Sequence, residues 1–480
     1  MKASRQVTAG KCCGFLLAVL LATAMPAESP AASVSADSAT AAEPAADAAT
    51  VLTRHLQSSA DLGEVRDLDA EWKEGVLRLS VEKTQRQPWV VIPAPKTGGG
   101  WDLAGRATVQ AEIVNTGSEP VGVMFWVVGD HGWDAVVDSA ALAPQQTRTF
   151  SCDLRAVFPD GTPKLNPRDV KQLQIMLGEP RQLPGKRDEK SAAQTHLIPR
   201  ITQPVSVEVR QVVARGKAAE WKRPAGRIDV PVVENTEPAP GKRVRYRPAG
   251  DESAGIYSVL HLPEDWRPGG RYPVIVEYPG NVFYATACYS TGLPEQCVIG
   301  FGMSRGAGAI CLGMPFVDRA AGRNVESGWG NADETVDYVL RVVGEVCEKF
   351  GGDRENVVLT GFSRGAIACG YIGLRNDRIA ALWKGFHACQ HYDGDGWNGA
   401  TLAGALERAT RFQGKGVFQT DNARAAFQPV MDAMKTEVTW EQSGLGFHAT
   451  AMFLDDRPST RRLRDWFWKL VGKTGEKPER

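Results

Sequence analysis

Two stretches of this chain read Gly-x-Ser-x-Gly, and the fold around them depends on which one lies between a strand and a helix. One runs from Gly302 to Gly306 and the other from Gly361 to Gly365. Because the chain has 50 glycines in 480 residues, a match to this motif is expected almost by chance, so the motif alone is weak evidence. A serine on a sharp turn between a buried strand and a helix is held exposed at a sheet edge, where it can act as a nucleophile.

Only the second stretch has a strand before it and a helix after it. Residues 356–360 form a short apolar run between polar residues, which predicts a strand buried on both faces. Residues 366–372 are apolar over a helical length. The first stretch is followed by residues 309–315, which read as a strand that ends at a proline. We therefore predict that Ser363 is the nucleophile and that Ser304 is a turn or helix residue leading into a strand.

Length and charge set the broad limits on what the chain can be. At 480 residues it exceeds one ordinary domain, so two domains are expected. Its 56 Lys and Arg balance its 56 Asp and Glu, and the sequence has no strongly basic block. Nothing in this balance favours a nucleic-acid partner or an anionic membrane surface.

Residues 1–27 have the pattern of a secretory signal peptide. Basic residues precede an apolar run from Cys12 to about Met25, and small residues suitable for cleavage follow. The run is shorter than the roughly 20 apolar residues that a membrane helix needs. We therefore expect a secreted or periplasmic protein without a membrane span after signal removal. The Ala-, Ser- and Pro-rich residues 28–50 predict a flexible leader.

Two of the nine cysteines lie in the signal peptide, and the remaining seven leave at least one free thiol in an exported chain. Cys288 and Cys297 bracket a short loop and are the best disulfide candidates; the alternative is that both are small buried apolar residues. No Cys/His spacing indicates zinc. The loop with Asp393, Asp395 and Asn398 lacks the distal glutamate of a calcium loop, so no metal site is predicted.

Residues 51–215 have the sequence pattern of an all-β domain. Short runs rich in β-branched residues, at 89–92, 107–114, 121–128 and 205–209, are separated by turn clusters, and this predicts a β-sandwich or jelly roll. The order of these pieces, with Trp101-Asp102-Leu103, the turn at 115–117 and a closing strand at 205–212, resembles galactose-binding-like modules of polysaccharide-degrading enzymes. The resemblance implies a carbohydrate-binding module, with a purely structural module as the alternative. The aromatic candidates for sugar stacking are Trp101, Trp126 and Trp133.

After a predicted linker over residues 216–245, the pattern changes to strands that alternate with helices. Residues 257–263, 272–278, 309–314 and 356–360 read as strands. Helical periodicity appears at 335–350 and 459–471. This alternation predicts an α/β domain over residues 246–475 with a mainly parallel sheet.

A serine nucleophile needs a base and an orienting acid, and both should follow strands of the same sheet. His448 lies on a predicted loop after the strand-like residues 436–440, so we predict it as the base. Among the other histidines, His387 and His391 are expected to line the pocket or to satisfy local hydrogen bonds. Asp421 follows the strand-like residues 416–420 and is the predicted acid. The alternative acids are Asp393 and Asp395.

The oxyanion of the reaction needs two N–H donors. One is predicted to be the backbone N–H of Arg364, directly after the nucleophile. The second is expected from the turn that follows residues 274–278, where Pro279 has no N–H and Gly280 allows a close approach. Asn281 or Val282 is therefore the predicted second donor.

Residues 262–276 and the turn Thr360-Gly361-Phe362-Ser363-Arg364-Gly365 resemble the α/β-hydrolase family, in its branch of secreted polysaccharide and polyester esterases. The resemblance covers roughly residues 240–475 and agrees with the chain order Ser363, Asp421, His448. It implies an eight-stranded sheet, acyl-enzyme chemistry and no cofactor. The family usually carries His-Gly after the third strand, where this chain has Pro279-Gly280.

Two loops are predicted to shape specificity, residues 324–333 and 391–399. Trp329 and Trp397 could flank a sugar ring, with His391 beside them. The sequence thus predicts an exported serine hydrolase that cleaves carboxylic esters of a polysaccharide or a small ester. The alternatives are a catalytically inactive sugar-binding protein and a serine peptidase of the same fold.

Overall fold

The computed structural model describes residues 49–129, 132–180, 197–198, 200–251, 255–285, 288–446 and 449–472. The predicted signal peptide and all but the last two residues of the predicted leader lie outside the described residues. All of these described residues belong to one compact unit. Within the described residues, no helix is long and apolar enough to cross a membrane.

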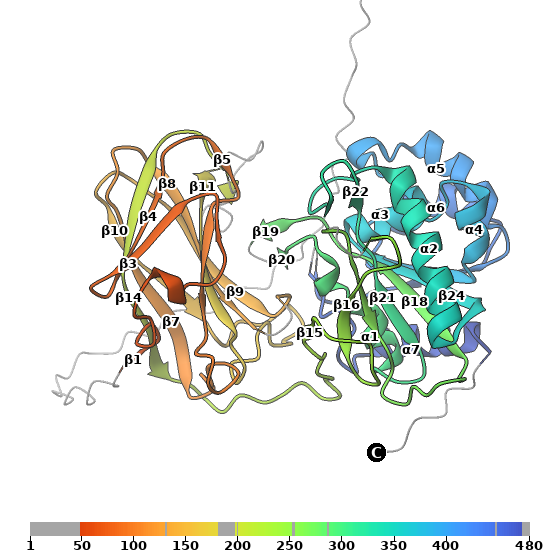
Figure 1. Cartoon of the computed structure of the whole chain (residues 1–480), viewed down its shortest axis with the longest axis horizontal. Helices are drawn as coiled ribbons and strands as arrows, with labels where there is room; N and C mark the ends of the chain where they lie inside the picture. Colours follow the sequence, from red (N-terminus) through yellow and green to blue (C-terminus); the bar gives the residue numbers. More distant parts are fainter. Residues whose placement is uncertain are drawn as a thin grey trace, which may run out of the picture. The chain divides into compact units, whose positions relative to one another are not determined.

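Residues 50–217, called here the β region, contain two six-stranded sheets in which every strand pair is antiparallel (Figure 1). The first sheet has the order β10-β7-β14-β4-β3, with β1 paired to β14, and the second has the order β2-β6-β11-β8-β9, with β12 paired to β11. The bounds are β1 Thr50–Val51, β2 Val65–Arg66, β3 Asp69–Lys73, β4 Val76–Val81, β6 Trp89–Pro93, β7 Arg106–Asn115, β8 Val121–Val128, β9 Ala135–Leu142, β10 Thr147–Asp153, β11 Gln172–Pro180, β12 Leu197–Ile198 and β14 Val205–Lys217; a short pair, β5 Gln85–Arg86 and β13 Arg200–Ile201, and the 3-10 turn η1 Ser59–Asp61 complete the region.

The alternation of buried and exposed residues explains how the two sheets share one core. In β4 the buried Leu77 and Leu79 alternate with more exposed residues, as expected of a strand with one covered face. These residues pack in one apolar cluster with Phe125 and Ile175 of the second sheet. Strand β8 is buried at every position, because a further apolar cluster, which includes Trp126, covers its other face.

The C-terminal part, residues 233–472, is called here the α/β region and is built on a nine-stranded sheet. Its order is β15-β16-β17-β21-β18-β24-β25-β26-β27. Six of its eight strand pairs are parallel, and the pairs of β17 with β16 and β21 are antiparallel. Among the described strands, parallel pairs occur only in this sheet, and most pairs of the chain are antiparallel. The bounds are β15 Val233–Glu234, β16 Arg243–Tyr246, β17 Ser258–His261, β18 Tyr272–Tyr278, β21 Ile310–Gly313, β24 Gly352–Phe362, β25 Gly385–Cys389, β26 Gly416–Thr420 and β27 Val438–Glu441.

Two expectations about this sheet need correction. The resemblance implied eight strands, and the ninth is the two-residue strand β15 at the edge. The predicted linker over residues 216–245 includes the end of β14, all of β15 and the start of β16. Short, isolated strands of this kind have too few residues to show a period in the sequence.

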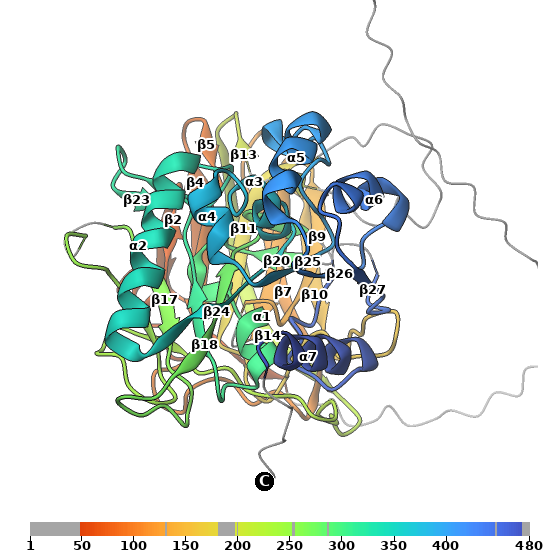
Figure 2. The same ribbon diagram turned by 90° about the vertical axis from the view of Figure 1, so that its right-hand side faces the viewer.

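Helices cover both faces of the nine-stranded sheet (Figure 2). On β18, Val274 and Val276 belong to the apolar cluster that contains residues of α2 to α6, whereas Ile275 points to the cluster of α1 and α7. The helices are α1 Ile299–Ser304, α2 Ala332–Phe350, α3 Arg364–Tyr371, α4 Asp377–Leu382, α5 Leu402–Ala409, α6 Arg424–Ala433 and α7 Pro458–Leu470; the short hairpins β19 Phe283–Ala285 with β20 Cys288–Ser290 and β22 Val317–Asp318 with β23 Arg323–Asn324 and the 3-10 turns η3 Pro294–Gln296, η4 Trp397–Gly399 and η5 Thr410–Phe412 lie between them.

The longest helix illustrates how local sequence fixes its ends. Helix α2 begins after Asn331, whose side chain accepts hydrogen bonds from the backbone N–H groups of Asp333 and Glu334. It ends at Gly351, which adopts a left-handed conformation with φ of 75°. The helices predicted at 335–350 and 459–471 are confirmed as α2 and α7, with ends that differ by at most three residues.

The predicted disulfide between Cys288 and Cys297 is absent, because all seven described cysteines are free. Both residues are buried, and the Cys297 thiol donates to the carbonyl of Glu277 at 3.5 Å. The alternative interpretation, that they are small buried apolar residues, is the one the structure supports.

Candidate active site

Ser363 lies on the turn between β24 and α3, so the strand and helix predicted around it are confirmed. Its backbone has φ of 56° and ψ of −119°. These angles match the first central position of a type II′ turn, which residues with a Cβ atom rarely adopt. The Ser363 N–H donates to the carbonyl of Cys389 at 3.1 Å, which fixes the turn beside the end of β25.

The two glycines of this motif are required by packing. A Cβ atom at Gly361 would overlap the backbone of Gly365, and a Cβ atom at Gly365 would overlap the carbonyl of Tyr278 on the neighbouring strand β18. The helix can therefore approach the sheet closely only with glycine at both positions. The two glycines of the Gly-x-Ser-x-Gly motif at residues 361–365 are therefore required by the structure.

Ser304 has a different environment. It is the last residue of α1, and its hydroxyl donates to the carbonyl of Gly300 at 3.1 Å. Arg305 ends the helix in a left-handed conformation, and the chain then enters β21. The order is helix before strand, as predicted from the sequence, and the hydroxyl is buried and committed to its own helix.

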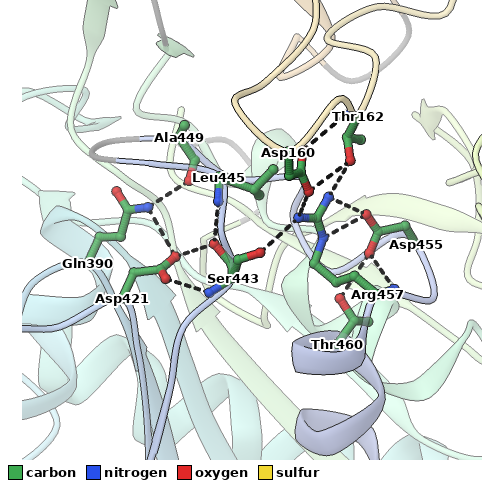
Figure 3. A network of polar contacts seen from close by, with 10 residues as sticks. All are labelled: Asp160, Thr162, Gln390, Asp421, Ser443, Leu445, Ala449, Asp455, Arg457 and Thr460. Atoms are coloured by element: carbon green, nitrogen blue, oxygen red, sulfur yellow. Dashed lines mark hydrogen bonds and ion pairs between the residues drawn. The ribbon is translucent and has the colours of Figure 1, made fainter. Parts of the chain in front are cut away.

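Asp421, the predicted acid, directly follows β26 and faces the loop that begins at Ser443 (Figure 3). Its carboxylate accepts hydrogen bonds from the Ser443 N–H at 2.6 Å and the Ser443 hydroxyl at 2.5 Å. Gln390 Nε2 approaches the same carboxylate at 3.4 Å. His448, the predicted base, lies outside the described residues.

Gln390 contacts the chain on both sides of the predicted base. Its Nε2 donates to the carbonyl of Gly446 at 3.1 Å and to that of Ala449 at 2.6 Å (Figure 3). Because Gln390 follows β25 directly, these bonds tie the loop to the sheet edge that also carries Ser363 and Asp421. Sequence reasoning missed Gln390, since its two shortest hydrogen bonds go to backbone carbonyls, which leave no signature in the sequence.

The two alternative acids have other partners. Asp393 is buried and forms a bidentate ion pair with Arg408, at 2.7 and 2.8 Å. Burial raises its pKa. Asp395 accepts from His391 Nδ1 at 2.9 Å and from the Trp397 N–H at 2.8 Å.

His387 satisfies local hydrogen bonds in the core, one of the two roles expected of it. Its ring nitrogens lie 2.8 Å from the Thr360 hydroxyl and 3.0 Å from the Thr420 hydroxyl, so it bridges three adjacent strands. Complete burial lowers its pKa to about 3, which keeps the imidazole neutral.

The structure narrows the predicted oxyanion donors. The Val282 N–H donates to the carbonyl of Glu326 at 2.8 Å, so this group is already engaged. Among the described residues, the Asn281 N–H has no acceptor, and its side chain is fixed by the Gly328 N–H at 3.0 Å. The Arg364 N–H belongs to the first turn of α3, where N–H groups have no partner within the helix. Arg364 and Asn281 are therefore the candidate pair.

The prediction that Trp329 flanks a sugar ring needs correction. Trp329 is only 7% exposed, and it stacks on Tyr371 with ring centroids 4.6 Å apart. Trp397 packs edge-on against it, with ring centroids 5.0 Å apart, and the Trp329 indole N–H donates to the carbonyl of Asn398 at 2.8 Å. Trp397 and His391 keep partial exposure and remain candidates for substrate contact.

Two of the three aromatic residues proposed to stack on sugars in the β region, Trp126 and Trp133, are engaged elsewhere, whereas Trp101 is half-buried and packs edge-on against His55, with ring centroids 5.9 Å apart. Trp126 is 1% exposed. Trp133 donates to the carbonyl of Gln296 at 2.8 Å and packs edge-on against Phe362, with ring centroids 5.5 Å apart. Phe362 precedes Ser363, so the β region contacts the turn that carries the predicted nucleophile. This arrangement favours the structural interpretation of the β region.

No family model and no curated protein matches the sequence. Solved structures that resemble it include a puromycin hydrolase (12% identity, 51% of this chain and 42% of that chain, TM-score 0.33) and a Bacillus cereus carboxylesterase (14% identity, 46% and 97%, TM-score 0.29). The AtxE2 isopeptidase covers more of this chain (12% identity, 86% and 77%, TM-score 0.34). At TM-scores this low the likenesses carry no argument about activity.

The architecture itself is informative. A mostly parallel sheet with helices on both faces carries a serine at a strained turn between strand β24 and helix α3. These features support an α/β-hydrolase fold. Figure 1 shows this sheet and its helices in the α/β region.

Proposed function

We propose that this chain is an exported serine hydrolase that cleaves carboxylic esters of a polysaccharide, with Ser363 as nucleophile, His448 as base and Asp421 as acid. The strained backbone of Ser363 carries the proposal, because a non-glycine residue with φ of 56° and ψ of −119° is retained only where surrounding structure or function demands it. The substrate class follows from the resemblance of the sequence to polysaccharide esterases.

In the proposed reaction, Ser363 Oγ attacks the ester carbonyl carbon while His448 accepts the hydroxyl proton. The carbonyl oxygen becomes an oxyanion, which the N–H groups of Arg364 and Asn281 stabilise. Collapse expels the alcohol, which takes the proton from His448, and leaves an acyl group on Ser363. Water, deprotonated by the same imidazole, releases the acid and restores the serine. Asp421 orients the imidazole throughout.

The deciding experiment compares Ser363→Ala with Ser304→Ala on a nitrophenyl acetate ester. We expect the first variant to be inactive and the second to retain turnover, since the Ser304 hydroxyl is bonded within α1. An inactive Ser304→Ala variant with a folded circular dichroism spectrum, beside an active Ser363→Ala variant, would refute the assignment.

Substrate panels then separate the remaining possibilities. Acetylated, feruloylated and methyl-glucuronoyl polysaccharides test the acyl and sugar groups. Faster turnover of peptides than of any ester would assign a serine peptidase instead. Absence of turnover with every substrate, together with polysaccharide binding, would assign an inactive sugar-binding protein.

A further inference from the structure

The side chain of Arg364 is buried next to the proposed nucleophile, and within the described part of the chain its hydrogen bonds go only to backbone carbonyls. It is 1% exposed. Nη1 donates to Val325 at 3.2 Å and to Gly328 at 2.9 Å, and Nη2 donates to Gly280 at 2.7 Å and to Gly292 at 2.9 Å. Its guanidinium also lies over the Phe316 ring, 4.1 Å from the ring centroid.

A buried guanidinium without an acidic partner is costly to maintain. Among the described residues, no carboxylate lies within ion-pair distance of Arg364, and burial lowers its pKa to about 9. Removing a cation from water is unfavourable unless charge and hydrogen bonds replace the lost hydration. An apolar side chain would fill the same space without this penalty, so the contacts of the guanidinium point to a specific task.

One of the four carbonyls belongs to the peptide group that carries the candidate oxyanion donor. Gly280 supplies the C=O and Asn281 the N–H of a single planar trans peptide, so these two groups point in opposite directions. A hydrogen bond from Arg364 to the Gly280 carbonyl therefore fixes the direction of the Asn281 N–H.

The same guanidinium also fixes the loop that holds the Asn281 side chain. Arg364 binds the carbonyls of Val325 and Gly328, and the Gly328 N–H donates to Asn281 Oδ1 at 3.0 Å. Asn281 is thus held through its peptide group and through its side chain. Both restraints lead back to Arg364.

We propose that Arg364 is the positioning residue of the oxyanion hole: its backbone supplies one N–H donor, and its side chain orients the Gly280–Asn281 peptide, whose N–H is the other. This inference rests on the proposed role of Ser363 as nucleophile.

Arg243 provides a matched control for Arg364. It is also buried, and it donates to the backbone carbonyls of Pro231, Glu295 and Cys297. None of these carbonyls belongs to the catalytic turn or to the loop at Asn281. Replacing either arginine should therefore lower the stability of the fold. Only replacement of Arg364 should also weaken stabilisation of the transition state.

The test compares Arg364→Lys with Arg243→Lys in the full chain. We expect kcat of Arg364→Lys to fall by about 10²–10³-fold with little change in KM, the size of losing one oxyanion donor. The inhibition constant of an alkyl boronic acid, which forms a tetrahedral anion on serine, should weaken by the same factor as kcat/KM. Arg243→Lys should keep both values. Equal kinetic losses in the two variants would overturn the proposal.

A second measurement needs no variant. In a crystal structure of the wild-type protein with the boronic acid bound, one boronate oxygen should lie about 2.7–3.1 Å from the backbone nitrogens of Arg364 and Asn281. An adduct on Ser363 whose oxygens meet other donors would overturn the positioning role alone. Failure of the boronic acid to bond to Ser363 would instead refute the proposed nucleophile.

Discussion

Replacing Ser363 by glycine is expected to stabilise the fold while it abolishes turnover, whereas alanine is expected to abolish turnover without the same gain. Ser363 has φ of 56° and ψ of −119°, a region that glycine enters freely and that a Cβ atom disfavours. Alanine keeps the Cβ atom and therefore keeps the strain. Both variants lack the hydroxyl, so its loss cancels when the two are compared.

The size of the difference follows from two opposing effects. A residue held in a sparsely populated backbone region costs about 1–3 kcal/mol of stability. Glycine loses more chain entropy on folding than alanine, by about 0.5–1 kcal/mol. The free energy of unfolding of Ser363→Gly should therefore exceed that of Ser363→Ala by up to about 2.5 kcal/mol.

Urea unfolding of both variants under identical conditions measures this difference. The two variants bury the same surface, so they should share one slope and differ in the midpoint. A midpoint for Ser363→Gly below that of Ser363→Ala would show that the strain at this residue is smaller than the entropy cost of glycine. The catalytic argument built on the strained backbone would then lose its support.

Three further predictions concern Glu277, Ser443 and Arg66. Burial raises the Glu277 pKa from 4.5 to about 8, so the folded protein retains a proton that the unfolded chain loses, and stability should fall by up to about 1.4 kcal/mol per pH unit across that window. In Glu277→Gln, unfolding measured from pH 5 to 8 should show a flatter profile, and an unchanged slope would contradict the assignment. Ser443→Ala removes the 2.5 Å hydroxyl bond to Asp421, so kcat should fall roughly 10–100-fold at constant KM in ester assays; wild-type kcat would show that this bond does not orient the acid. Arg66→Met breaks a bidentate ion pair with Glu326 of the α/β region and should lower the free energy of unfolding, measured in denaturant, by about 1–2 kcal/mol. The control Arg78→Met, at a more exposed ion pair, should lower it by less than about 0.5 kcal/mol. Equal losses would show that the Arg66–Glu326 pair adds no particular stability.

The turn that carries Ser363 could be predicted from the sequence because its signals are contiguous. The apolar run of β24, the two glycines and the start of α3 follow one another within twenty residues, and each has a local physical cause. The position of Asp421 could be predicted for the same reason, since it directly follows a strand. The neighbouring residues in the sequence are enough to predict such features.

Trp329 shows where this reasoning fails. Its loop position suggested an exposed ring, but its burial depends on Tyr371 and Trp397, which other elements contribute. The free state of Cys288 and Cys297 has a similar cause, because closeness in sequence does not bring two thiols together.

The functional side chains that sequence reasoning missed share one property: they bind the backbone. Gln390 binds the carbonyls on both sides of the loop with His448, and Arg364 binds four carbonyls around the catalytic turn. Every residue has a carbonyl, so the sequence does not reveal which one will be the acceptor. Only the fold identifies these contacts.

The contacts of the β region favour a structural role over the sugar-binding role that its resemblance to sugar-binding modules implied. Trp133 packs on Phe362 beside Ser363, and Arg66 pairs with Glu326, whose carbonyl accepts from the Val282 N–H in the loop after Asn281. On the other side of the site, Arg457 donates to Asp160 of the β region at 2.7 Å and to the Ser443 carbonyl at 3.1 Å (Figure 3).

Catalytic groups must be held within about 0.5 Å of their productive positions, so a site built on loops depends on the residues that pack and hydrogen-bond around those loops. Here the β region supports the loop of the proposed oxyanion donor through Glu326 and the loop that begins at Ser443 through Arg457. Removal of the β region should therefore lower kcat even on a small soluble ester that no sugar-binding surface could recognise. A detachable sugar-binding module would instead affect only polymeric substrates, so the ratio of the two losses distinguishes a structural part of the catalytic site from a binding module.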